Sequence, residues 1–310
     1  MRLTRVHARL PRAARDATHA WWERSALWIE LDDGRRGEAA PLPGRSRETL
    51  DDVQRALEAL GDSVLTMGPD ALVAHLGPSG AAAIEHARLE RPLDGSAQVR
   101  VQTLLDTPHD ALSHALVAHA RGVRAFKLKI GASDDELALI PALRAALGDE
   151  VRLVADANGT LAPGDPRLRA LADAGFALIE DPFPLALLRT SRSTVPLEVA
   201  LDEPLPSTSD DDVARLIDAR IVDALVLKPT LLGLARALRL ARLGAPACAS
   251  HTYESPLGMT LCATLACALG DRVVHGIAPY AGLDAWHLED GAAISVPSCL
   301  RSDGVVERPA

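Results

Sequence analysis

Aromatic residues, paired cysteines and long apolar runs are all scarce in this chain. Phe, Trp and Tyr together make up 3% of 310 residues, and this compositional bias does not indicate any function. No two of the four cysteines form a CxxC pair, so we interpret them as reduced core residues. Apolar runs such as 224–227 and 261–269 are far shorter than the roughly 20 residues that cross a bilayer, which excludes a membrane span.

Clusters of positive charge are also missing. With a net charge of −9, the chain lacks the electrostatic footprint needed for nucleic acid or an anionic membrane surface. Residues 1–15 carry arginines but no continuous apolar core, so they fail as a signal peptide and we expect a cytoplasmic protein. What the chain does have is 48% hydrophobic residues, enough for one large domain and a smaller one.

Short aliphatic runs alternate with amphipathic stretches, such as 110–120 and 134–147, over most of the chain. Eight such pairs predict parallel strands joined by right-handed crossovers, and polar residues gather at several strand ends, as in barrel enzymes. We therefore predict an α/β fold with a (β/α) barrel of about eight strands, a modified TIM barrel. A doubly wound open sheet is the alternative. The predicted strands are 99–104, 125–130, 152–155, 177–180, 198–201, 224–228, 245–250 and 272–276.

Three segments follow from this pattern. Residues 1–95 contain predicted strands over 26–31 and 37–41 with a turn between them and helices after them, which indicates an N-terminal α+β capping domain. Residues 96–283 form the catalytic barrel. Residues 284–310 are too few to fold alone and are expected to pack back on the cap or the barrel.

Two lysines, Lys127 and Lys129, lie on the second predicted strand. Because strand side chains alternate between faces, both ammonium groups point the same way. An edge strand with a solvated lysine face would explain them, but Phe126 and Ile130 indicate a central strand. We therefore infer that both lysines face the barrel interior.

Carboxylates end the next three predicted strands: Asp156, Glu180 and Asp202. One such residue often caps a helix, but three converging on one point repel each other and need a counter-cation. An all-oxygen set without His or Cys favours Mg²⁺, with Mn²⁺ as a substitute. Lys228 ends the sixth strand. Alone it would indicate an anion clamp, but opposite the second strand it places two lysines across the metal.

Five short motifs at these strand ends carry a family resemblance. They are Lys127-Leu128-Lys129, Asp156-Ala157-Asn158, Glu180-Asp181-Pro182, Asp202-Glu203 and Leu227-Lys228-Pro229. Together they resemble the muconate-lactonizing subgroup of the enolase superfamily over nearly the whole barrel. Segments 37–50, 228–233 and 250–258 further resemble the o-succinylbenzoate synthase family. His251 and Tyr253 depart from the small hydroxyl residues that are usual in the last segment.

The resemblance implies a magnesium-dependent hydro-lyase of menaquinone biosynthesis. Its reaction is the syn-dehydration of 2-succinyl-6-hydroxy-2,4-cyclohexadiene-1-carboxylate, a small carboxylate, to 2-succinylbenzoate. Lys129 would be the base, Lys127 a second positive charge beside it, and Lys228 the stabilising group on the other face. The residues implied to support the ligands or to contact substrate are Asn158, Glu203, Ser250, Thr252 and Glu254.

Two classes of alternative stay open. An N-succinylamino acid racemase or a dipeptide epimerase would use the same lysines to exchange an α-proton, although residues 276–284 lack the Asp-x-Asp usual after strand eight of the epimerases. A non-catalytic barrel that binds an anion is the other class, but it has no need for carboxylates and lysines together. His275 and His287 are expected to lie outside the site, and the oligomeric state stays open.

Overall fold

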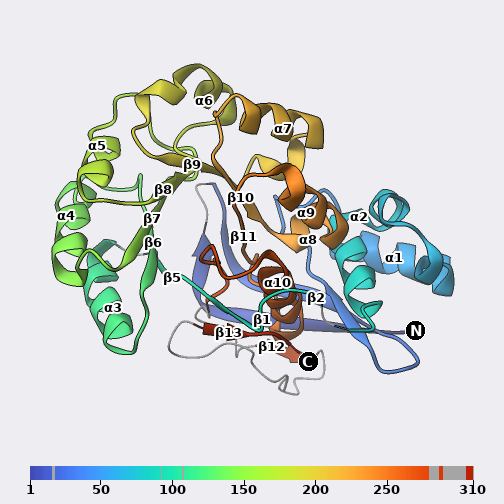
Figure 1. Ribbon diagram of the computed structural model, residues 1–310. Helices are drawn as coiled ribbons and strands as arrows, with labels where there is room; N and C mark the ends of the chain where they lie inside the picture. Colours follow the sequence, from blue (N-terminus) through green and yellow to red (C-terminus); the bar gives the residue numbers. More distant parts are fainter. Residues whose placement is uncertain (16–17, 92, 107, 279–285, 289–304, 310) are drawn as a thin grey trace.

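Long antiparallel strands build the N-terminal cap of the computed structural model, which describes residues 1–15, 18–91, 93–106, 108–278, 286–288 and 305–309 (Figure 1). The cap sheet has the order β12-β1-β2-β3. Three helical elements follow it in the chain. The elements are β1 (Arg2–Arg15), β2 (Ala20–Glu30), β3 (Arg36–Ala39), β12 (Trp286–Leu288), α1 (Leu50–Leu60), η1 (Gly61–Thr66) and α2 (Pro69–Ala87).

The cap core forms where the sheet meets α1 and α2. Leu27 and Ile29, which lie on one face of β2, pack with Leu57 of α1 and Leu72 of α2. Helix α1 begins at Thr49, whose side chain accepts from the backbone N–H of Asp52 while the Asp52 carboxylate accepts from the Thr49 N–H, the two halves of a capping box. The predicted α+β composition of the cap is therefore observed.

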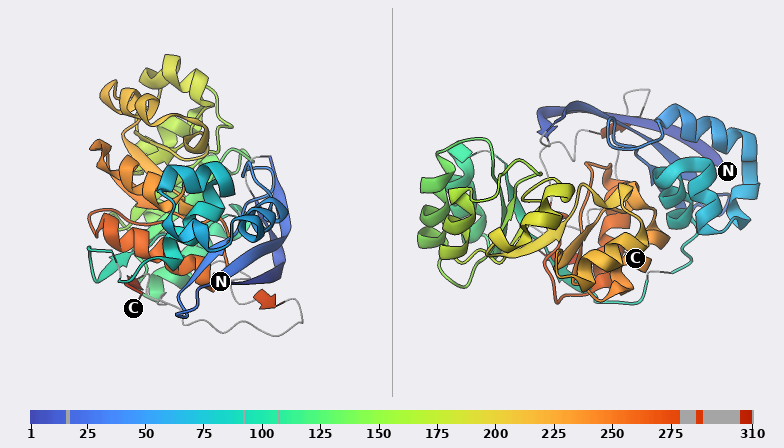
Figure 2. Two further views of the ribbon diagram at one scale, coloured as in Figure 1. Left: turned by 90° about the vertical axis from the view of Figure 1, so that its right-hand side faces the viewer. Right: turned by 90° about the horizontal axis from the view of Figure 1, so that it is seen from above.

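A curled parallel sheet of seven strands forms the second layer, with the order β11-β10-β9-β8-β7-β6-β5. Its helices cover the outer face, as the view from above shows most clearly (Figure 2). Aliphatic side chains such as Ile179, Val199 and Leu225 pack between sheet and helices in the main core. The strands are β5 (Thr103–Leu105), β6 (Ala125–Lys129), β7 (Arg152–Asp156), β8 (Leu178–Glu180), β9 (Glu198–Leu201), β10 (Ala224–Leu227) and β11 (Ala247–Ala249).

Helices or short 3-10 turns connect successive strands, as the alternating pattern predicts. Their bounds are α3 (Pro108–Ala120), α4 (Glu136–Leu147), α5 (Pro166–Asp173), α6 (Leu185–Ser191), η2 (Arg192–Thr194), η3 (Leu205–Ser207), α7 (Asp210–Asp218), α8 (Pro229–Leu232), α9 (Leu234–Leu240), η4 (Ala241–Leu243) and α10 (Pro256–Leu269). Within the described part of the chain, no helix is long and apolar enough to cross a membrane.

The barrel of eight strands is observed only in part, because the predicted strand over 272–276 is not a regular strand. His275 makes an isolated parallel bridge to Val101, and Gly276 makes one to Ser250. The first predicted strand, 99–104, is also divided. Its start belongs to β4 (Gln98–Arg100), which pairs antiparallel with β13 (Val305–Glu307), and β5 continues the parallel sheet.

The ends of the chain meet elements far away in sequence. Strand β12 pairs with β1 of the cap, whereas β13 pairs with β4 at the start of the barrel segment. The sequence prediction missed β1, because arginines recur along it and disguise the alternation of buried Val6, Ala8 and Leu10. Most of residues 284–310, including Cys299, lie outside the described residues.

Candidate active site

The C-terminal ends of neighbouring strands bring the predicted residues together. Lys129 pairs in register with Asp156, and Asp156 with Glu180, so three adjacent strands present polar side chains side by side. Asp202 does not continue this row, because Glu180 is level with Ala200. Two positions along a strand return to the same face, and barrel strands are staggered, so Asp202 still faces the same side.

Two of the lysines are ion-paired to these carboxylates. Lys127 Nζ lies 2.9 Å from Glu180 Oε2 and 3.4 Å from Asp156 Oδ2. Lys228 Nζ donates to Asp202 Oδ2 at 2.7 Å. Burial opposes the charged form of Lys127, but Glu180, Asp156 and Asp202 outweigh burial and raise its pKa well above the ordinary value.

Burial dominates the electrostatics of the carboxylates. Asp156, Glu180 and Asp202 expose 3%, 1% and 4% of their surface. Burial raises the pKa of Glu180 to about 7, and the Lys127 ammonium only partly opposes this shift. Burial also acts on Asp156, but Lys127 and the two other lysines outweigh it and lower the pKa of this carboxyl.

The donor set fits a hard divalent cation in its chemistry, since it consists of buried carboxylate oxygens. In the described residues, however, no three His, Cys, Asp or Glu side chains are already gathered as a metal site. Lysine ammonium groups contact the carboxylate oxygens instead. The assignment of Asp156, Glu180 and Asp202 as Mg²⁺ ligands stays a prediction.

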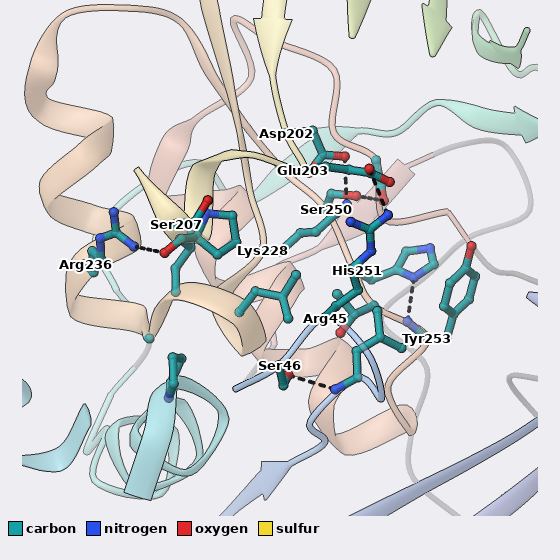
Figure 3. A pocket seen from close by; sticks show the side chains of 18 of the residues that line it. Arg45, Ser46, Asp202, Glu203, Ser207, Lys228, Arg236, Ser250, His251 and Tyr253 are labelled. Atoms are coloured by element: carbon teal, nitrogen blue, oxygen red, sulfur yellow. Dashed lines mark hydrogen bonds and ion pairs between the residues drawn. The ribbon is translucent and has the colours of Figure 1, made fainter. Parts of the chain in front are cut away.

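Lys129 is held by both the cap and the barrel. Its Nζ donates to the carbonyl oxygen of Arg15, at the end of β1, at 2.7 Å and to Asn158 Oδ1 at 3.2 Å. Asn158 Nδ2 donates to Glu203 Oε1 at 3.2 Å, and Arg45 Nη2 donates to Glu203 Oε2 at 2.8 Å. Figure 3 shows the Arg45 guanidinium facing Glu203. The two supporting residues predicted from the sequence, Asn158 and Glu203, thus connect Lys129 to the cap.

These side chains line one cavity of about 490 Å³ between cap and barrel. Cap residues Trp21 and Leu42 form an apolar part of its wall, and Tyr253 of the barrel packs against them. Trp21 and Tyr253 are tilted to each other with ring centroids 6.3 Å apart. A cavity of this size, with apolar walls and a few polar groups, is typical of a small-molecule site.

The loop after β11 carries three of the predicted contact residues. Ser250 and Thr252 line the cavity. Glu254 is fully buried, and its carboxylate accepts from the backbone N–H of Thr252 at 2.6 Å and from the hydroxyls of Thr252 and Thr230 at 2.5 and 2.6 Å. These contacts give Glu254 a supporting position, in which it fixes the loop that bears Thr252.

Three non-glycine residues in the loops of the site have left-handed backbone. Their φ angles are 45° at Asn158, 39° at Asp181 and 62° at Tyr253. Such conformations cost about 1–3 kcal/mol each and persist where surrounding contacts enforce them. Asp181 has these contacts, since its carboxylate accepts from the backbone N–H groups of Asp202 and Glu203 at 3.1 and 2.7 Å. Asp181 therefore fixes the end of β9 and does not cap a helix of its own.

His275, His287 and the strand cysteine Cys248 do not line the cavity. His275 is buried, with Nδ1 accepting from the Ala249 N–H at 3.0 Å and Nε2 lying 2.9 Å from the Gly270 carbonyl oxygen. His287 lies on the cap strand β12. Burial raises the pKa of the Cys248 thiol to about 12, which opposes a nucleophilic role.

The enolase C-terminal domain-like family matches residues 111–306 of this chain. That is more than half of the sequence and includes every predicted lysine and carboxylate. This chain belongs to the enolase superfamily. Curated relatives agree with the assignment. The o-succinylbenzoate synthase of Thermosynechococcus vestitus is 31% identical over 245 residues, 70% of this chain and 71% of the relative. That of Yersinia enterocolitica is 32% identical over 283 residues, 82% of each.

Solved structures show the same enolase superfamily fold. The L-Ala-D/L-Glu epimerase of Bacillus subtilis has a TM-score of 0.79 at 19% identity, covering 99% of this chain and 95% of that one. A dipeptide epimerase of Enterococcus faecalis, complexed with Mg and a dipeptide, has a TM-score of 0.75 at 22% identity, with 100% and 98% covered. MenC of Desulfotalea psychrophila has a TM-score of 0.75 at 20% identity, with 98% and 99% covered.

A compositional signal for the active site of this enolase superfamily member was missed. Of the 33 Lys and Arg residues in the whole sequence, only three are lysines, and they are Lys127, Lys129 and Lys228. All three line the cavity. Arginine supplies the positive charge everywhere else, yet it cannot titrate as a base, so lysine stands where an ammonium group with a lower pKa is useful.

Arg45 was also missed as a residue of the site. It lies within the segment 37–50 that carries the family resemblance, but that segment belongs to the cap, and its approach to Glu203 is a tertiary contact across 158 residues of sequence. No spacing rule in a single sequence predicts such a contact.

Proposed function

We propose that this enolase superfamily member is an o-succinylbenzoate synthase acting on 2-succinyl-6-hydroxy-2,4-cyclohexadiene-1-carboxylate. The observation that carries the proposal is the gathering of all three lysines with Asp156 and Asp202 at one cavity, where Lys127 also pairs with the buried Glu180. Such a site suits removal of a proton beside a carboxylate. The curated relatives, about a third identical and named for this reaction, support the choice of substrate.

In the proposed reaction Lys129, as the free amine, takes the ring proton beside the carboxylate. The electron pair of that C–H bond moves into the ring, the neighbouring C–O bond breaks, and hydroxide leaves with the bonding pair. Lys129 returns its proton to the departing oxygen on the same face, which yields water and the aromatic 2-succinylbenzoate. The Lys228 ammonium stabilises the negative charge that accumulates between these steps.

Asp156, Glu180 and Asp202 would hold a Mg²⁺ ion, which supplies positive charge next to the substrate carboxylate. Relatives of the same fold support this, since the dipeptide epimerase of Enterococcus faecalis is complexed with Mg. Trp21, Leu42 and Tyr253 present apolar surface where the ring and succinyl chain would lie.

A product assay tests the proposed function. Purified protein is mixed with the cyclohexadiene substrate and Mg²⁺, with and without EDTA, and 2-succinylbenzoate is measured by chromatography. We expect turnover that EDTA abolishes and added Mg²⁺ restores. Absence of product at full Mg²⁺ would refute the synthase assignment.

N-Succinylamino acid racemization is the second candidate, and the epimerase structures of the same fold favour keeping it. It would use Lys129 and Lys228 as acid and base on opposite sides of an α-carbon. Incubation of N-succinylamino acids with the protein in D₂O distinguishes the two. Exchange of the α-proton without any dehydration of the cyclohexadiene would replace the synthase by the racemase.

A further inference from the structure

A continuous chain of hydrogen bonds joins the cap to the group that we propose as the base. It runs from Arg45 to Glu203 at 2.8 Å, from Glu203 to Asn158 at 3.2 Å, and from Asn158 to Lys129 at 3.2 Å. Arg45 is the only member of this chain that belongs to the cap. Figure 3 shows its guanidinium next to the Glu203 carboxylate.

The two hydrogen bonds of the Asn158 side-chain amide can form in only one orientation of that amide. The ammonium form of Lys129 can only donate, so in that form Asn158 offers its carbonyl oxygen to Lys129. An ionised Glu203 can only accept, so Asn158 offers its amide nitrogen there. Rotating the Asn158 amide by half a turn would lose both bonds. The position of the Glu203 carboxylate therefore determines how Asn158 presents its oxygen to Lys129.

Glu203 itself is fixed at two places. Its backbone N–H donates to the Asp181 carboxylate at 2.7 Å, which holds the main chain. The side chain is held by Arg45 at one oxygen and by Asn158 at the other. Without Arg45, the carboxylate keeps its main-chain anchor but loses the contact that orients its oxygens.

The segment that carries Arg45 is firmly attached to the cap strand β2. The fully buried Arg24 donates to the carbonyl oxygens of Ala40 and Pro41 at 2.9 and 3.0 Å. Trp21 Nε1 donates to the Pro43 carbonyl oxygen at 2.9 Å. The backbone of Arg45 therefore has a fixed position relative to the cap sheet.

The turn itself is closed by its own hydrogen bonds. The N–H groups of Arg45 and Ser46 donate to the Leu42 carbonyl oxygen at 2.9 and 2.8 Å, and the Leu42 N–H donates to the Ser46 hydroxyl oxygen at 2.9 Å. Gly44 adopts a φ of 80°, and a Cβ there would lie 2.5 Å from His19 Nε2. These contacts hold the backbone of Arg45 in one place.

We propose that Arg45 is a positioning residue that aligns Lys129 through Glu203 and Asn158, so that the base is correctly oriented only when the cap lies over the barrel mouth. The inference rests on the proposed role of Lys129. Arg45 need not touch the substrate for this effect. Direct binding of a substrate carboxylate by Arg45 is the competing explanation, and kinetics separate the two.

Steady-state kinetics of Arg45→Met and Arg45→Lys test this role. Loss of a group that orients a reacting residue typically costs about 10–100-fold in activity. We expect a fall of that size in kcat for Arg45→Met with little change in KM, and partial recovery in Arg45→Lys, which restores one donor. Arg55→Met is the matched control, because Arg55 is a cap arginine in a solvent-exposed pair with Asp52. It should behave as the wild type.

A double-mutant comparison tests whether Arg45 acts on Lys129 through Glu203. In a Glu203→Gln background, Arg45→Met should cause little further loss, because the path through Glu203 is already weakened. A rise in KM at unchanged kcat, or a full additional loss in the Glu203→Gln background, would overturn the positioning role in favour of direct substrate binding. Unchanged kinetics in Arg45→Met would also overturn it.

A measurement without substrate or metal keeps this role separate from the proposed function. Protein labelled with ¹⁵N at lysine gives three side-chain signals at most, since the sequence has three lysines. We expect Arg45→Met to shift or broaden the Lys129 signal and to leave those of Lys127 and Lys228 in place, with Lys129→Arg identifying the signal. Lack of turnover in the wild type would refute the synthase assignment, whereas an unmoved Lys129 signal in Arg45→Met would refute the coupling.

Discussion

Lys129 and Lys228 have different surroundings, so we expect their substitution by alanine to reduce the reaction rate by different factors. Lys129 contacts neutral oxygens of Arg15 and Asn158, whereas Lys228 is paired to the buried Asp202 carboxylate. A proton-transfer residue contributes about 10²–10⁴-fold and a charge-stabilising one about 10²–10³-fold. We expect Lys129→Ala to lower the rates of dehydration and of α-proton exchange on the Lys129 face by about 10²–10⁴-fold.

Stopped-flow assays of dehydration and NMR assays of exchange measure this prediction. Circular dichroism of Lys129→Ala should match the wild type, since the side chain is only partly buried at the cavity surface. Lys129→Ala with wild-type kcat would remove Lys129 from the mechanism. Lys228→Ala should reduce kcat for dehydration but leave slow exchange measurable, because the proposed base is retained.

Glu38 is the clearest titrating residue away from the carboxylates of the site. Its carboxylate is buried at the junction of cap and barrel, where it accepts from Trp28 Nε1 at 2.8 Å and from the Ser255 N–H at 2.9 Å. Burial raises its pKa from 4.5 to about 7. The folded state therefore retains a proton that the unfolded chain releases, so this group stabilises the fold below pH 4.5 and loses that contribution as pH rises to about 7.

Chemical denaturation at pH 5, 6, 7 and 8 checks the sign. We expect the unfolding free energy of the wild type to contain a falling component over this range, of roughly 3 kcal/mol for the full shift, and Glu38→Gln to lack it. Glu23→Gln, an exposed change on the neighbouring β2, is the control and should keep the wild-type slope. An identical slope in Glu38→Gln would contradict the prediction.

At the scale of elements, helix α2 contains a break that depends on one glycine. Gly77 has a φ of 72° and a ψ of 171°, and Pro78 follows it. A Cβ at Gly77 would lie 2.4 Å from Glu48 Cδ, and Glu48 Oε1 accepts from the Ser79 N–H at 2.8 Å, as a cap for the second half of the helix. The close approach of Glu48 explains why this position has no side chain.

Gly77→Ala should therefore destabilise the cap for two reasons, the left-handed backbone and the clash with Glu48. Gly34→Ala separates them, because Gly34 has a φ of 85° but nothing within 4 Å of a Cβ. We expect about 1–2 kcal/mol from backbone strain in Gly34→Ala and a clearly larger loss in Gly77→Ala, measured by urea denaturation. Equal losses would show that Glu48 moves away without cost.

The elements also show what a single sequence can predict. Strands β6 to β10 were found because each is a short buried aliphatic run bounded by helical pattern, and their polar ends determine the site. The stagger that moves Asp202 two positions beyond Glu180 was not predicted, since it depends on strand tilt. The eighth strand was predicted over 272–276, but the structure gives only bridges at His275 and Gly276. Whether residues 272–276 form a regular strand depends on their backbone hydrogen bonds to the segments on both sides, which contain Val101 and Ser250, and the sequence of the segment alone does not determine these bonds.

At the scale of the whole molecule, the metal prediction has a readout that does not need catalysis. If Asp156, Glu180 and Asp202 bind Mg²⁺ in the folded state only, Mg²⁺ increases the free energy of unfolding by mass action, by about 2.7 kcal/mol at a hundred times the dissociation constant. The melting temperature rises accordingly. We expect this shift in the wild type and its loss in Glu180→Gln. Differential scanning calorimetry with increasing Mg²⁺ measures it, and Ca²⁺ in place of Mg²⁺ tests selectivity.

Glu180→Gln carries its own control. Glu180→Gln removes one partner of a buried ion pair with Lys127, so the metal-free variant should melt below the metal-free wild type. The Mg²⁺-dependent shift of each protein is therefore measured from its own metal-free melting temperature. A Mg²⁺-dependent shift of equal size in Glu180→Gln would show that the ion binds elsewhere.

Because all three lysines of the sequence line the cavity, reagents that modify lysine side chains react with the protein at this site. Succinimidyl esters, aldehyde cross-linkers and lysine-specific proteases find their side-chain targets at the site and nowhere else along the sequence. Coupling through lysine to a resin would thus inactivate the protein, and a bound carboxylate ligand would shield it from the reagent. Arginine and carboxylate reagents are not selective in this way, because Arg45, Asp156 and Glu203 line the same cavity.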